Sequence, residues 1–353
     1  MEMNRTVFGD CRATMRAWAA AGVKVQTCVT SPPYFGLRDY GHDGQIGLEA
    51  TPDEFVAAMV EVFRCVRDVL ADDGTLWLNL GDSYNAAGRT GHGTRQGFKQ
   101  GTNRASAEKT DNCRPSVESL KPKDLIGIPW RVAFALQADG WYLRQDIIWH
   151  KPNPMPESVT DRCTKAHEYL FLLTKSERYF YDAESILEPA SPGTHARLSQ
   201  DVQNQIGSAR GYAGADADRP MKAVGRGHNT RPRKSVPNGA GTGFKVKNND
   251  SFNEAMAIMP THRNKRSVWT VPTKPYSGAH FATFPPALIK PCILAGSRPG
   301  DIVLDPFIGS GTTAAVAMQH DRQYLGCELN PEYGPLQQER IAEFSMPLFQ
   351  EAA

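Results

Sequence analysis

The sequence lacks a long hydrophobic run, a paired cysteine motif and a recognisable leader. No stretch approaches the roughly 20 apolar residues that a membrane-spanning helix needs. The first ten residues, MEMNRTVFGD, do not show the basic, apolar and small-residue order of a signal peptide. We therefore expect a cytoplasmic protein with no membrane segment. The seven cysteines are scattered without a CxxC pair, which argues against a disulfide framework and a structural zinc site, so no metal is expected.

The chain has almost no excess of one charge, because its net charge is only +2 in 353 residues. The composition, 40% apolar and 22% charged, is that of a globular chain with one large or two ordinary domains. Positive charge is nevertheless concentrated locally. Residues 191–275 hold 14 lysines and arginines against five acidic residues. This basic stretch favours contact with a polyanion, and its simpler interpretation is a solvated surface.

The C-terminal end alternates short apolar runs with helical patterns, which predicts a parallel sheet covered by helices. The expected order is strand, helix, strand and helix, over residues 301–305, 312–320, 322–328 and 331–344. A parallel sheet of only two strands is too small to be buried between helices, so further strands must come from another part of the chain. The same alternation occurs at the other end of the chain, as strand 6–8, helix 11–20 and strand 25–29. We therefore predict a circularly permuted sheet built from both ends.

The alternation continues with a helix that starts at a capping box formed by Thr51 and Glu54, with Pro52 in its first turn. Its apolar stripe has spacings of four, three, four and three, at Phe55, Met59, Val62, Val66 and Val69. The remaining predicted elements are strand 75–80, helix 124–138, and strands 141–150 and 167–174. The connection between the last two is rich in proline, which indicates an antiparallel pair at one edge of the sheet.

Two irregular stretches suggest the domain organisation. Residues 85–119 are rich in Gly, Thr, Asn and basic residues, which is typical of a mobile surface loop or of a loop that closes on a ligand. Both interpretations stay open. The basic stretch is similarly rich in Gly and Asn. We expect one half of the main domain in residues 1–185, an inserted region in 186–267, and the second half in 268–353.

The segment DPFIGSGTT, residues 305–313, places glycines where a strand ends and a helix begins. Glycine there lets a ligand approach the backbone, and the helix start supplies free amide donors. Gly309, Gly311 and Ala314 also satisfy the dinucleotide-binding pattern, so an NAD site stays open at this point. Glu328 ends the next strand, where a carboxylate accepts hydrogen bonds from ribose hydroxyls or caps the following helix.

TSPPY, residues 30–34, directly follows the predicted strand 25–29. Two consecutive prolines fix a rigid, extended turn at the carboxyl end of that strand, which is where α/β sheets bind ligands. Tyr34 adds a flat face for stacking. An isolated segment of this kind would fit an ordinary surface turn.

In this order, TSPPY, a basic middle stretch, DPFIGSGTT and GCELNPEY resemble the amino-methylating DNA methyltransferases of the permuted β-class. The resemblance covers about residues 6–344, apart from the two irregular stretches. The resemblance implies the Rossmann-like class I α/β fold, with a mostly parallel twisted sheet, an antiparallel edge strand and an inserted DNA-recognition region. It also implies S-adenosylmethionine as the cofactor and a flipped-out base as the acceptor. SPPY is commoner among family members that modify cytosine N4, and DPPY among those that modify adenine N6. Cytosine N4 is therefore expected, with adenine N6 as the alternative.

The resemblance assigns roles to three groups of residues. Catalysis is expected from Ser31, Pro32, Pro33 and Tyr34. Cofactor contacts are expected from Asp10, Cys11, His280, Phe284, Pro285, Asp305, Pro306, Phe307, Gly309, Ser310, Gly311, Thr312, Thr313, Glu328 and Leu329. DNA contacts are expected from Arg231, Arg233, Lys234, Lys245, Lys247, Arg263, Lys265 and Arg266. Within these groups Asp10 would accept from the adenine amino group, Asp305 would lie near the cofactor amino group, and Glu328 would hold the ribose.

The resemblance also places segments 78–84 and 145–156 beside the target-base pocket. It makes residues 1–185 the catalytic half, 186–267 the target-recognition region and 268–353 the cofactor-binding half. The expected partners are double-stranded DNA and a cognate restriction endonuclease, with a monomer or a homodimer as the oligomeric state.

An exocyclic amino nitrogen is a poor nucleophile because its lone pair is shared with the base ring. The Ser31 hydroxyl and the Pro32 carbonyl are each expected to accept one amino hydrogen, which aims the lone pair at the sulfonium methyl. No cysteine has the sequence context of a carbon-5 cytosine methyltransferase, so no covalent intermediate is expected. Three other functions stay open: an RNA or protein amino methyltransferase, an NAD-dependent oxidoreductase, and a binding protein that has lost catalysis.

Overall fold

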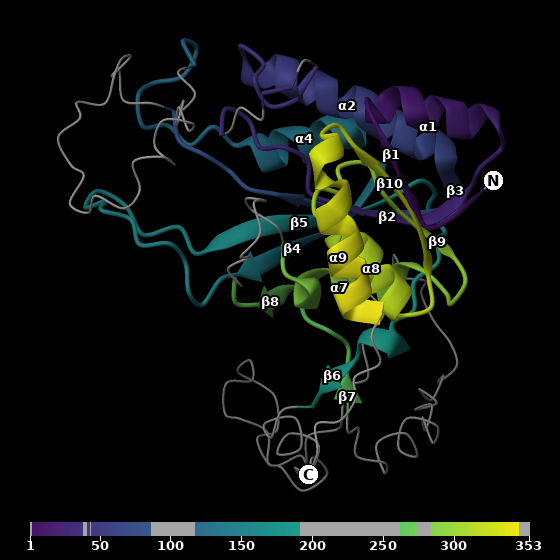
Figure 1. Ribbon diagram of the computed structural model, residues 1–353. Helices are drawn as coiled ribbons and strands as arrows, with labels where there is room; N and C mark the ends of the chain where they lie inside the picture. The colour runs from purple at the N-terminus through teal and green to yellow at the C-terminus, as the bar shows by residue number, and fades with distance from the viewer. Residues whose placement is uncertain are drawn as a thin grey trace, which may run out of the picture. The chain divides into compact units, whose positions relative to one another are not determined.

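The structure is a computed structural model that describes residues 2–37, 41–42, 44–85, 117–190, 262–273 and 284–345 (Figure 1). The chain divides into two compact units. The larger unit joins residues 1–186 to residues 265–353, and the smaller unit comprises residues 187–264. In the described part of the smaller unit, β6 (Glu188–Pro189) and β7 (His262–Arg263) form an antiparallel pair.

The larger unit contains an eight-stranded sheet in the order β1-β10-β9-β2-β3-β5-β4-β8. Its strands are β1 (Arg5–Phe8), β2 (Val25–Thr30), β3 (Leu70–Leu80), β4 (Tyr142–His150), β5 (His167–Thr174), β8 (Val268–Thr270), β9 (Ile302–Asp305) and β10 (Gln323–Glu328). Neighbouring strands run parallel except on both sides of β5, which is antiparallel to β3 and β4. In the β1–β10 pair, Phe8 lies opposite Glu328. Both ends of the chain therefore build one sheet, as the strand count predicts.

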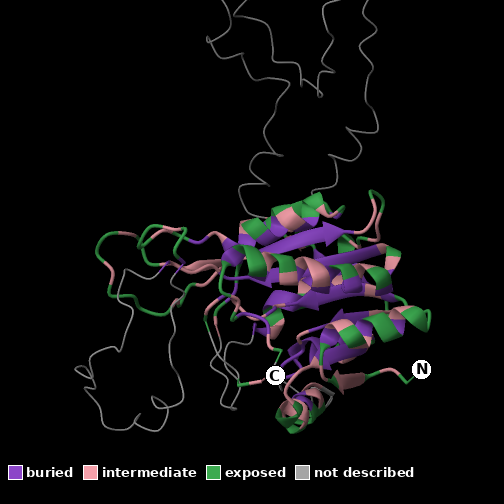
Figure 2. Ribbon diagram, turned by 90° about the horizontal axis from the view of Figure 1, so that it is seen from above, coloured by how far each residue is buried: buried purple, intermediate pink, exposed green. Residues whose placement is uncertain are grey.

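Helices cover both faces of this sheet (Figure 1). One face carries α1 (Cys11–Ala20), α2 (Pro52–Val69) and α4 (Ile128–Ala138), and the other carries α7 (Pro286–Gly296), α8 (Thr312–Gln319) and α9 (Gly334–Ser345). Two short 3₁₀ turns, η1 (Glu184–Ile186) and η2 (Pro331–Tyr333), complete the unit. In Figure 2 the central strands are buried, while the outward faces of the helices are exposed. Within the described ranges, no helix is long and apolar enough to cross a membrane.

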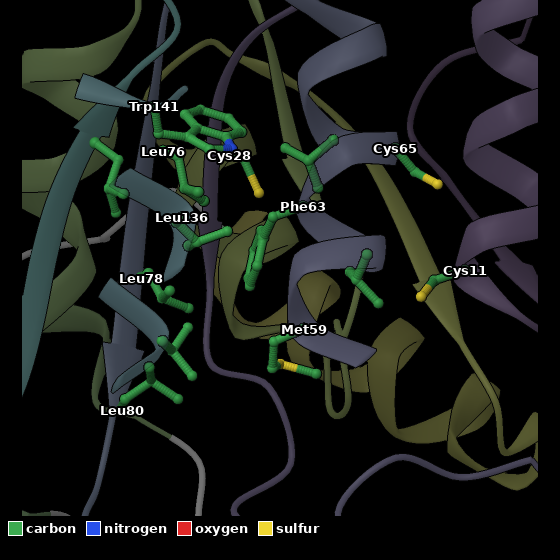
Figure 3. Packing of buried hydrophobic residues seen from close by; sticks show 14 of the residues in the cluster. Cys11, Cys28, Met59, Phe63, Cys65, Leu76, Leu78, Leu80, Leu136 and Trp141 are labelled. Carbon is green, nitrogen blue, oxygen red and sulfur yellow. The ribbon is translucent and has the colours of Figure 1, made fainter. Parts of the chain in front are cut away.

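The hydrophobic core is divided between the two faces because side chains alternate along each strand. Leu76 and Leu78 of β3 pack on the α2 face, whereas Trp77 between them packs on the α7 face. Figure 3 shows Met59 and Phe63 of α2 in the first of these layers, close to β3. The strands are therefore covered by apolar side chains from both sides, as a mostly parallel sheet requires.

Helix α2 has the start and the buried face that its sequence predicts. The Glu54 amide donates to Thr51 Oγ1 at 3.2 Å, and the Thr51 amide donates to Glu54 Oε2 at 3.2 Å, which completes the capping box. The predicted apolar stripe is confirmed, since no exposed surface is left on Phe55, Met59, Val62, Val66 and Val69.

Several predicted boundaries differ in the structure. The helix expected from residue 124 begins at Ile128, because Gly127 is left-handed with a φ of 80° and the Asp82 side chain caps the helix from a distant loop. Asp82 Oδ1 accepts hydrogen bonds from the Gly127 and Ile128 amides at 2.9 and 3.2 Å. The last helix is split into η2 and α9, and β3 starts at Leu70 instead of residue 75.

The predicted antiparallel pair of β4 and β5 is confirmed, but it does not form the edge of the sheet. Strand β8 lies beyond β4 and pairs with it in parallel, with Trp149 opposite Trp269. The sequence patterns predict neither β8 nor α7. The reversed strand is therefore an interior strand, with β3 on one side and β4 on the other.

Candidate active site

The carboxyl ends of four parallel strands, β1, β2, β9 and β10, open into one cavity. Segments that follow these strands form its wall. The lining residues are Gly9, Asp10 and Cys11 after β1; Ser31, Pro32, Pro33, Tyr34, Leu37, His42, Gly44, Gln45 and Ile46 after β2; Pro306, Phe307 and Gly309 after β9; and Cys327, Glu328, Leu329, Asn330 and Tyr333 at and beyond the end of β10. The proline turn and the glycine loop are 275 residues apart in the sequence, as Thr30 and Asp305 show, and they line one cavity.

Glu328 is the last residue of β10, and backbone amides from two loops hold its carboxylate. Oε2 accepts from the Gly309 amide at 2.9 Å, and Oε1 accepts from the Asn330 amide at 2.9 Å. Burial raises the pKa of Glu328, while the hydrogen bonds from Asn330 and Gly309 oppose that rise. Each carboxylate oxygen keeps a second lone pair, so Glu328 can accept further hydrogen bonds from a ligand in the cavity.

Asp305, the last residue of β9, lies behind the cavity and is 1% exposed. Its Oδ1 accepts from Thr30 Oγ1 at 2.7 Å and from the Phe307 amide at 3.0 Å, and its Oδ2 accepts from Thr313 Oγ1 at 2.6 Å. Burial raises the pKa of Asp305 to about 6, against the effect of these three hydrogen bonds. Thr30 directly precedes Ser31, and Thr313 lies in the first turn of α8. Asp305 therefore fastens the proline turn to the glycine loop.

Tyr34 lines the cavity, and its hydroxyl bonds to residues outside the cavity wall. The hydroxyl donates to Glu168 Oε2 at 2.7 Å, with Asn79 Oδ1 as a more distant acceptor at 3.3 Å. Glu168 also forms an ion pair with the Lys151 ammonium. A Cβ atom on Gly81 would lie 2.5 Å from Tyr34 Cε2, so the tyrosine ring packs directly on the Gly81 backbone. Segment 78–84 thus lies beside the proline turn, and segment 145–156 is linked to it through Glu168.

Asp10 and Cys11 line the cavity at the start of α1. Asp10 caps this helix, because its Oδ1 accepts from the Arg12 amide at 2.8 Å, and it pairs with the Arg12 guanidinium at 2.9 Å. Burial raises the pKa of Asp10, but the hydrogen bonds and charge of Arg12 outweigh it, so the pKa lies below its ordinary value. Burial raises the pKa of Cys11 to about 12, which makes it a neutral packing thiol and a poor nucleophile.

The other predicted cofactor residues divide into those that line the cavity and those that do not. Pro306, Phe307 and Leu329 line it. The Ser310 and Thr312 hydroxyls instead accept hydrogen bonds from Arg340. The remaining positions outside the wall are Gly311, which packs against Gln337, Phe284, which belongs to the core on the α7 face, and Pro285, which precedes α7. His280 lies outside the described residues.

The predicted DNA-binding residues are described only in part. Arg263 pairs with Glu188 at 3.0 Å within the smaller unit. In the larger unit, Lys265 Nζ lies 5.0 Å from the centroid of the Trp269 ring, and the Arg266 carbonyl accepts from Trp269 Nε1 at 2.6 Å. The residues outside the described ranges are Arg231, Arg233, Lys234, Lys245 and Lys247.

One wall of the cavity is not marked by the predicted motifs. The lining residues outside those motifs are Leu37, His42, Gly44, Gln45 and Ile46. Asn330 and Tyr333 also line the cavity and lie in the GCELNPEY motif, but the resemblance assigns no role to them. A usable signal for most of the residues outside the motifs is the glycine-rich run GHDGQIG, residues 41–47, in which the glycines have φ values of 73°, 80° and 112°. Such values favour glycine and bring a loop back over the proline turn. In the described part of the chain, no cluster of His, Cys, Asp or Glu side chains is suited to hold a metal ion.

Comparison with known proteins gives consistent matches over nearly the whole chain. The model of the N6/N4 methyltransferase family, described as DNA methylase, matches residues 25–339. Type II methyltransferase M.Cfr9I of Citrobacter freundii is 46% identical over 335 residues, which cover 94% of this chain and 86% of the relative. Type II methyltransferase M.SmaI of Serratia marcescens is 44% identical over 338 residues, which cover 96% of this chain and 90% of the relative.

Solved structures share the fold at lower identity. A proposed DNA modification methylase of Thermus thermophilus, TTHA0409 in complex with S-adenosyl-L-methionine, has a TM-score of 0.53 at 21% identity, over 98% of this chain and 95% of that chain. The PvuII DNA methyltransferase, which is cytosine-N4-specific, has a TM-score of 0.54 at 15% identity, over 100% of this chain and 89% of that chain. At these identities the similarity establishes the architecture of the chain.

Proposed function

The chain belongs to the N6/N4 DNA methylase family, and from this premise we propose that it is a Type II methyltransferase that methylates cytosine N4 in double-stranded DNA, with S-adenosylmethionine as the donor. The proposal depends on one observation above all: the proline turn, the glycine loop and Glu328 line the same cavity. Ser31 favours cytosine as the target, because SPPY is typical of the cytosine N4 enzymes that this sequence resembles. The alternative is adenine N6.

The residues around the cavity fit S-adenosylmethionine. Glu328 offers free lone pairs to ribose hydroxyls, and Asp10 offers an ionised carboxylate to the adenine amino group. The φ of 51° at Gly309 suits a close approach of ligand to backbone. When bound, the cofactor supplies an electrophilic methyl group on a sulfonium. For Asp305, which is buried behind the wall and already accepts three hydrogen bonds, we propose a positioning role between the two loops in place of a cofactor contact.

The proline turn provides the acceptor site in this proposal. The Ser31 hydroxyl and the Pro32 carbonyl each accept one hydrogen from the target amino group, so its lone pair is directed away from the ring. Tyr34 stacks on the extruded base, which partly offsets the few kcal/mol that flipping costs. The cysteines in the described cavity wall, Cys11 and Cys327, do not act as nucleophiles, because burial raises the pKa of both thiols.

The same proposal includes the basic stretch as the DNA-recognition region, a cytoplasmic location and a cognate restriction endonuclease. The stretch concentrates lysine and arginine side chains in one part of the sequence, and such side chains neutralise DNA phosphates. A partner nuclease is suggested by relatives named Type II methyltransferases.

The acceptor base is tested by giving the enzyme duplex DNA and S-adenosylmethionine with a trideuterated methyl group. The DNA is then digested to nucleosides and analysed by mass spectrometry. We expect labelled N4-methylcytosine. Labelled N6-methyladenine would show that adenine N6 is the target instead of cytosine N4. Label in RNA or protein but not in DNA would contradict the proposal.

Ser31→Ala removes one proposed acceptor of an amino hydrogen. We expect S-adenosylmethionine affinity within about twofold of the wild type, and a transfer rate lower by roughly 10²-fold, as for loss of one preorganised transition-state hydrogen bond. Calorimetry and single-turnover assays measure the two quantities. Ser176→Ala is the matched control, because the Ser176 hydroxyl donates to the Asp72 carbonyl at 2.6 Å, away from the cavity. Full activity of Ser31→Ala would exclude the proposed amino contact.

A further inference from the structure

The Tyr34 hydroxyl is anchored in a polar cluster that does not line the cavity. Its single hydrogen is directed to Glu168 Oε2 at 2.7 Å, while Asn79 Oδ1 at 3.3 Å is too distant to compete. Tyr34 lines the cavity, whereas Asn79 and Glu168 do not. Tyr34 therefore contributes to the cavity wall, while its hydroxyl end is held by β5, 134 residues away in the sequence.

Glu168 is in turn held in place by charge and by hydrogen bonding. The Lys151 ammonium pairs with the other carboxylate oxygen, and the two side chains are only 18% and 14% exposed. Lys151 Nζ also lies 4.2 Å from the centroid of the Trp149 ring. Asn79 Nδ2 donates to Glu168 Oε2 at 3.3 Å. A hydrogen bond from a hydroxyl to a charge-paired carboxylate is shorter and stronger than one between neutral groups.

The Tyr34 ring is restrained at a second point. A Cβ atom on Gly81 would lie 2.5 Å from Cε2, 3.1 Å from Cδ2 and 3.2 Å from Cζ of the ring, so the ring lies on the bare backbone of Gly81. The bond to Glu168 holds the hydroxyl end of the ring in place, and contact with Gly81 limits rotation of the ring about its long axis. Together they fix the plane of the ring before any base arrives.

We propose that Glu168 is a positioning residue for methyl transfer: by holding the Tyr34 hydroxyl, it fixes the ring on which the target base stacks. This inference rests on the proposed function, since it needs an extruded base. When the ring is already fixed, stacking of the base does not have to order the Tyr34 side chain, so the entropy cost of binding is smaller. Because Tyr34 follows Ser31 and Pro32 in one rigid turn, the orientation of the ring also sets where the amino group meets its acceptors.

Tyr34→Phe, Glu168→Ala and the double variant form the test. Tyr34→Phe removes only the hydroxyl and leaves the Glu168–Lys151 pair in place. We expect each single variant to lower the single-turnover rate on duplex DNA by on the order of tenfold, the range for one hydrogen bond to a charged group. In the Tyr34→Phe background, Glu168→Ala should lower the rate by less than about threefold, because its partner is already absent.

Two further measurements separate positioning from general stability. S-adenosylmethionine affinity should stay within about twofold of the wild type, whereas the fluorescence rise of 2-aminopurine at the target position should be smaller in both single variants. Glu168→Gln keeps an oxygen acceptor for the phenol, so it should recover part of the rate. Asp72→Asn is the control, since that carboxylate is 94% exposed and lies at the amino end of β3.

Additive losses in the double variant would overturn the inference, as would a Tyr34→Phe variant with unchanged rate and 2-aminopurine signal. If Glu168→Ala does not fold, Tyr34→Phe decides alone. Failure of the wild type to methylate duplex DNA would contradict the proposed function. An active wild type with insensitive Tyr34 and Glu168 variants would contradict this inference only.

Discussion

Asp305→Asn is expected to remove a specific pH dependence from the stability of the protein. Asp305 is 1% exposed and joins β9 to the proline turn and to α8 through Thr30 and Thr313. Asparagine has nearly the same shape but does not titrate. Its amide oxygen can still accept a hydrogen bond, and the threonine hydroxyls can rotate to accept from its amide nitrogen.

The magnitude follows from the pKa of Asp305, which burial raises from 3.8 to about 6. A raised pKa means that the folded state prefers the protonated carboxyl. Well below pH 4 this preference stabilises the folded state fully, and the contribution is lost as the pH rises through about 6 to about 7, where the folded protein has also released its proton. At 1.36 kcal/mol per pKa unit, the loss over this window is about 3 kcal/mol.

The assay is urea unfolding of the wild type and Asp305→Asn between pH 4 and pH 7, followed by tryptophan fluorescence. The informative quantity is the difference between their free energies of unfolding, because titration of all other groups cancels in it. The free energy of unfolding of the wild type minus that of Asp305→Asn should fall by about 2 kcal/mol between pH 4 and pH 6 and level off near pH 7. In contrast, Asp72 is exposed and its pKa is lowered by Lys175, so the matched difference for Asp72→Asn should not fall. A flat or rising difference for Asp305→Asn would refute the reasoning.

Two other predictions concern the cofactor and DNA. Glu328→Gln should weaken S-adenosylmethionine binding by roughly tenfold or more, because the new amide nitrogen cannot accept from the Gly309 or Asn330 amide; an unchanged calorimetric dissociation constant would exclude the proposed ribose contact. Alanine substitution of Arg231, Arg233 and Lys234 together should weaken DNA binding and reduce the slope of log K against log salt concentration by up to about 3. An unchanged slope in fluorescence anisotropy would count against phosphate contacts by these residues.

The sequence predicts the elements around the cavity well because their signals are local. Strands β9 and β10 are short apolar runs that end at a loop, and α1 starts at its capping Asp10. The pairing of β1 with β10 follows from the number of predicted strands, because each end of the chain alone has too few strands to form a buried sheet. The shared cavity then follows, because the carboxyl ends of neighbouring parallel strands lie at one edge.

The elements that sequence patterns miss depend on distant contacts. Helix α7 contains Pro286 and Pro291, which argue against a helix, although Pro286 occupies the first turn where proline is tolerated. Strand β8 has three residues and no periodic signal, and it is defined by its pairing with β4. The start of α4 depends on the Asp82 side chain, which lies 45 residues before Gly127.

The same limit applies to the candidate site. Ser31 and Glu328 stand in motifs that can be recognised from neighbouring residues. Glu168 occupies an ordinary position in a predicted strand, and nothing near it in the sequence indicates a bond to Tyr34. Asp305 stands in a motif, but its enclosure by Thr30 and Thr313 depends on the pairing of β2 with β9.

The central claim is that the cavity between the two ends of the chain holds the methyl donor against the proline turn. A crystal structure of the protein with S-adenosylmethionine tests it most directly. We expect the ribose hydroxyls within hydrogen-bond distance of Glu328 and the sulfonium methyl directed toward Ser31 and Pro32. A cofactor bound outside this cavity, or one whose methyl group faces away from Ser31, would contradict the account.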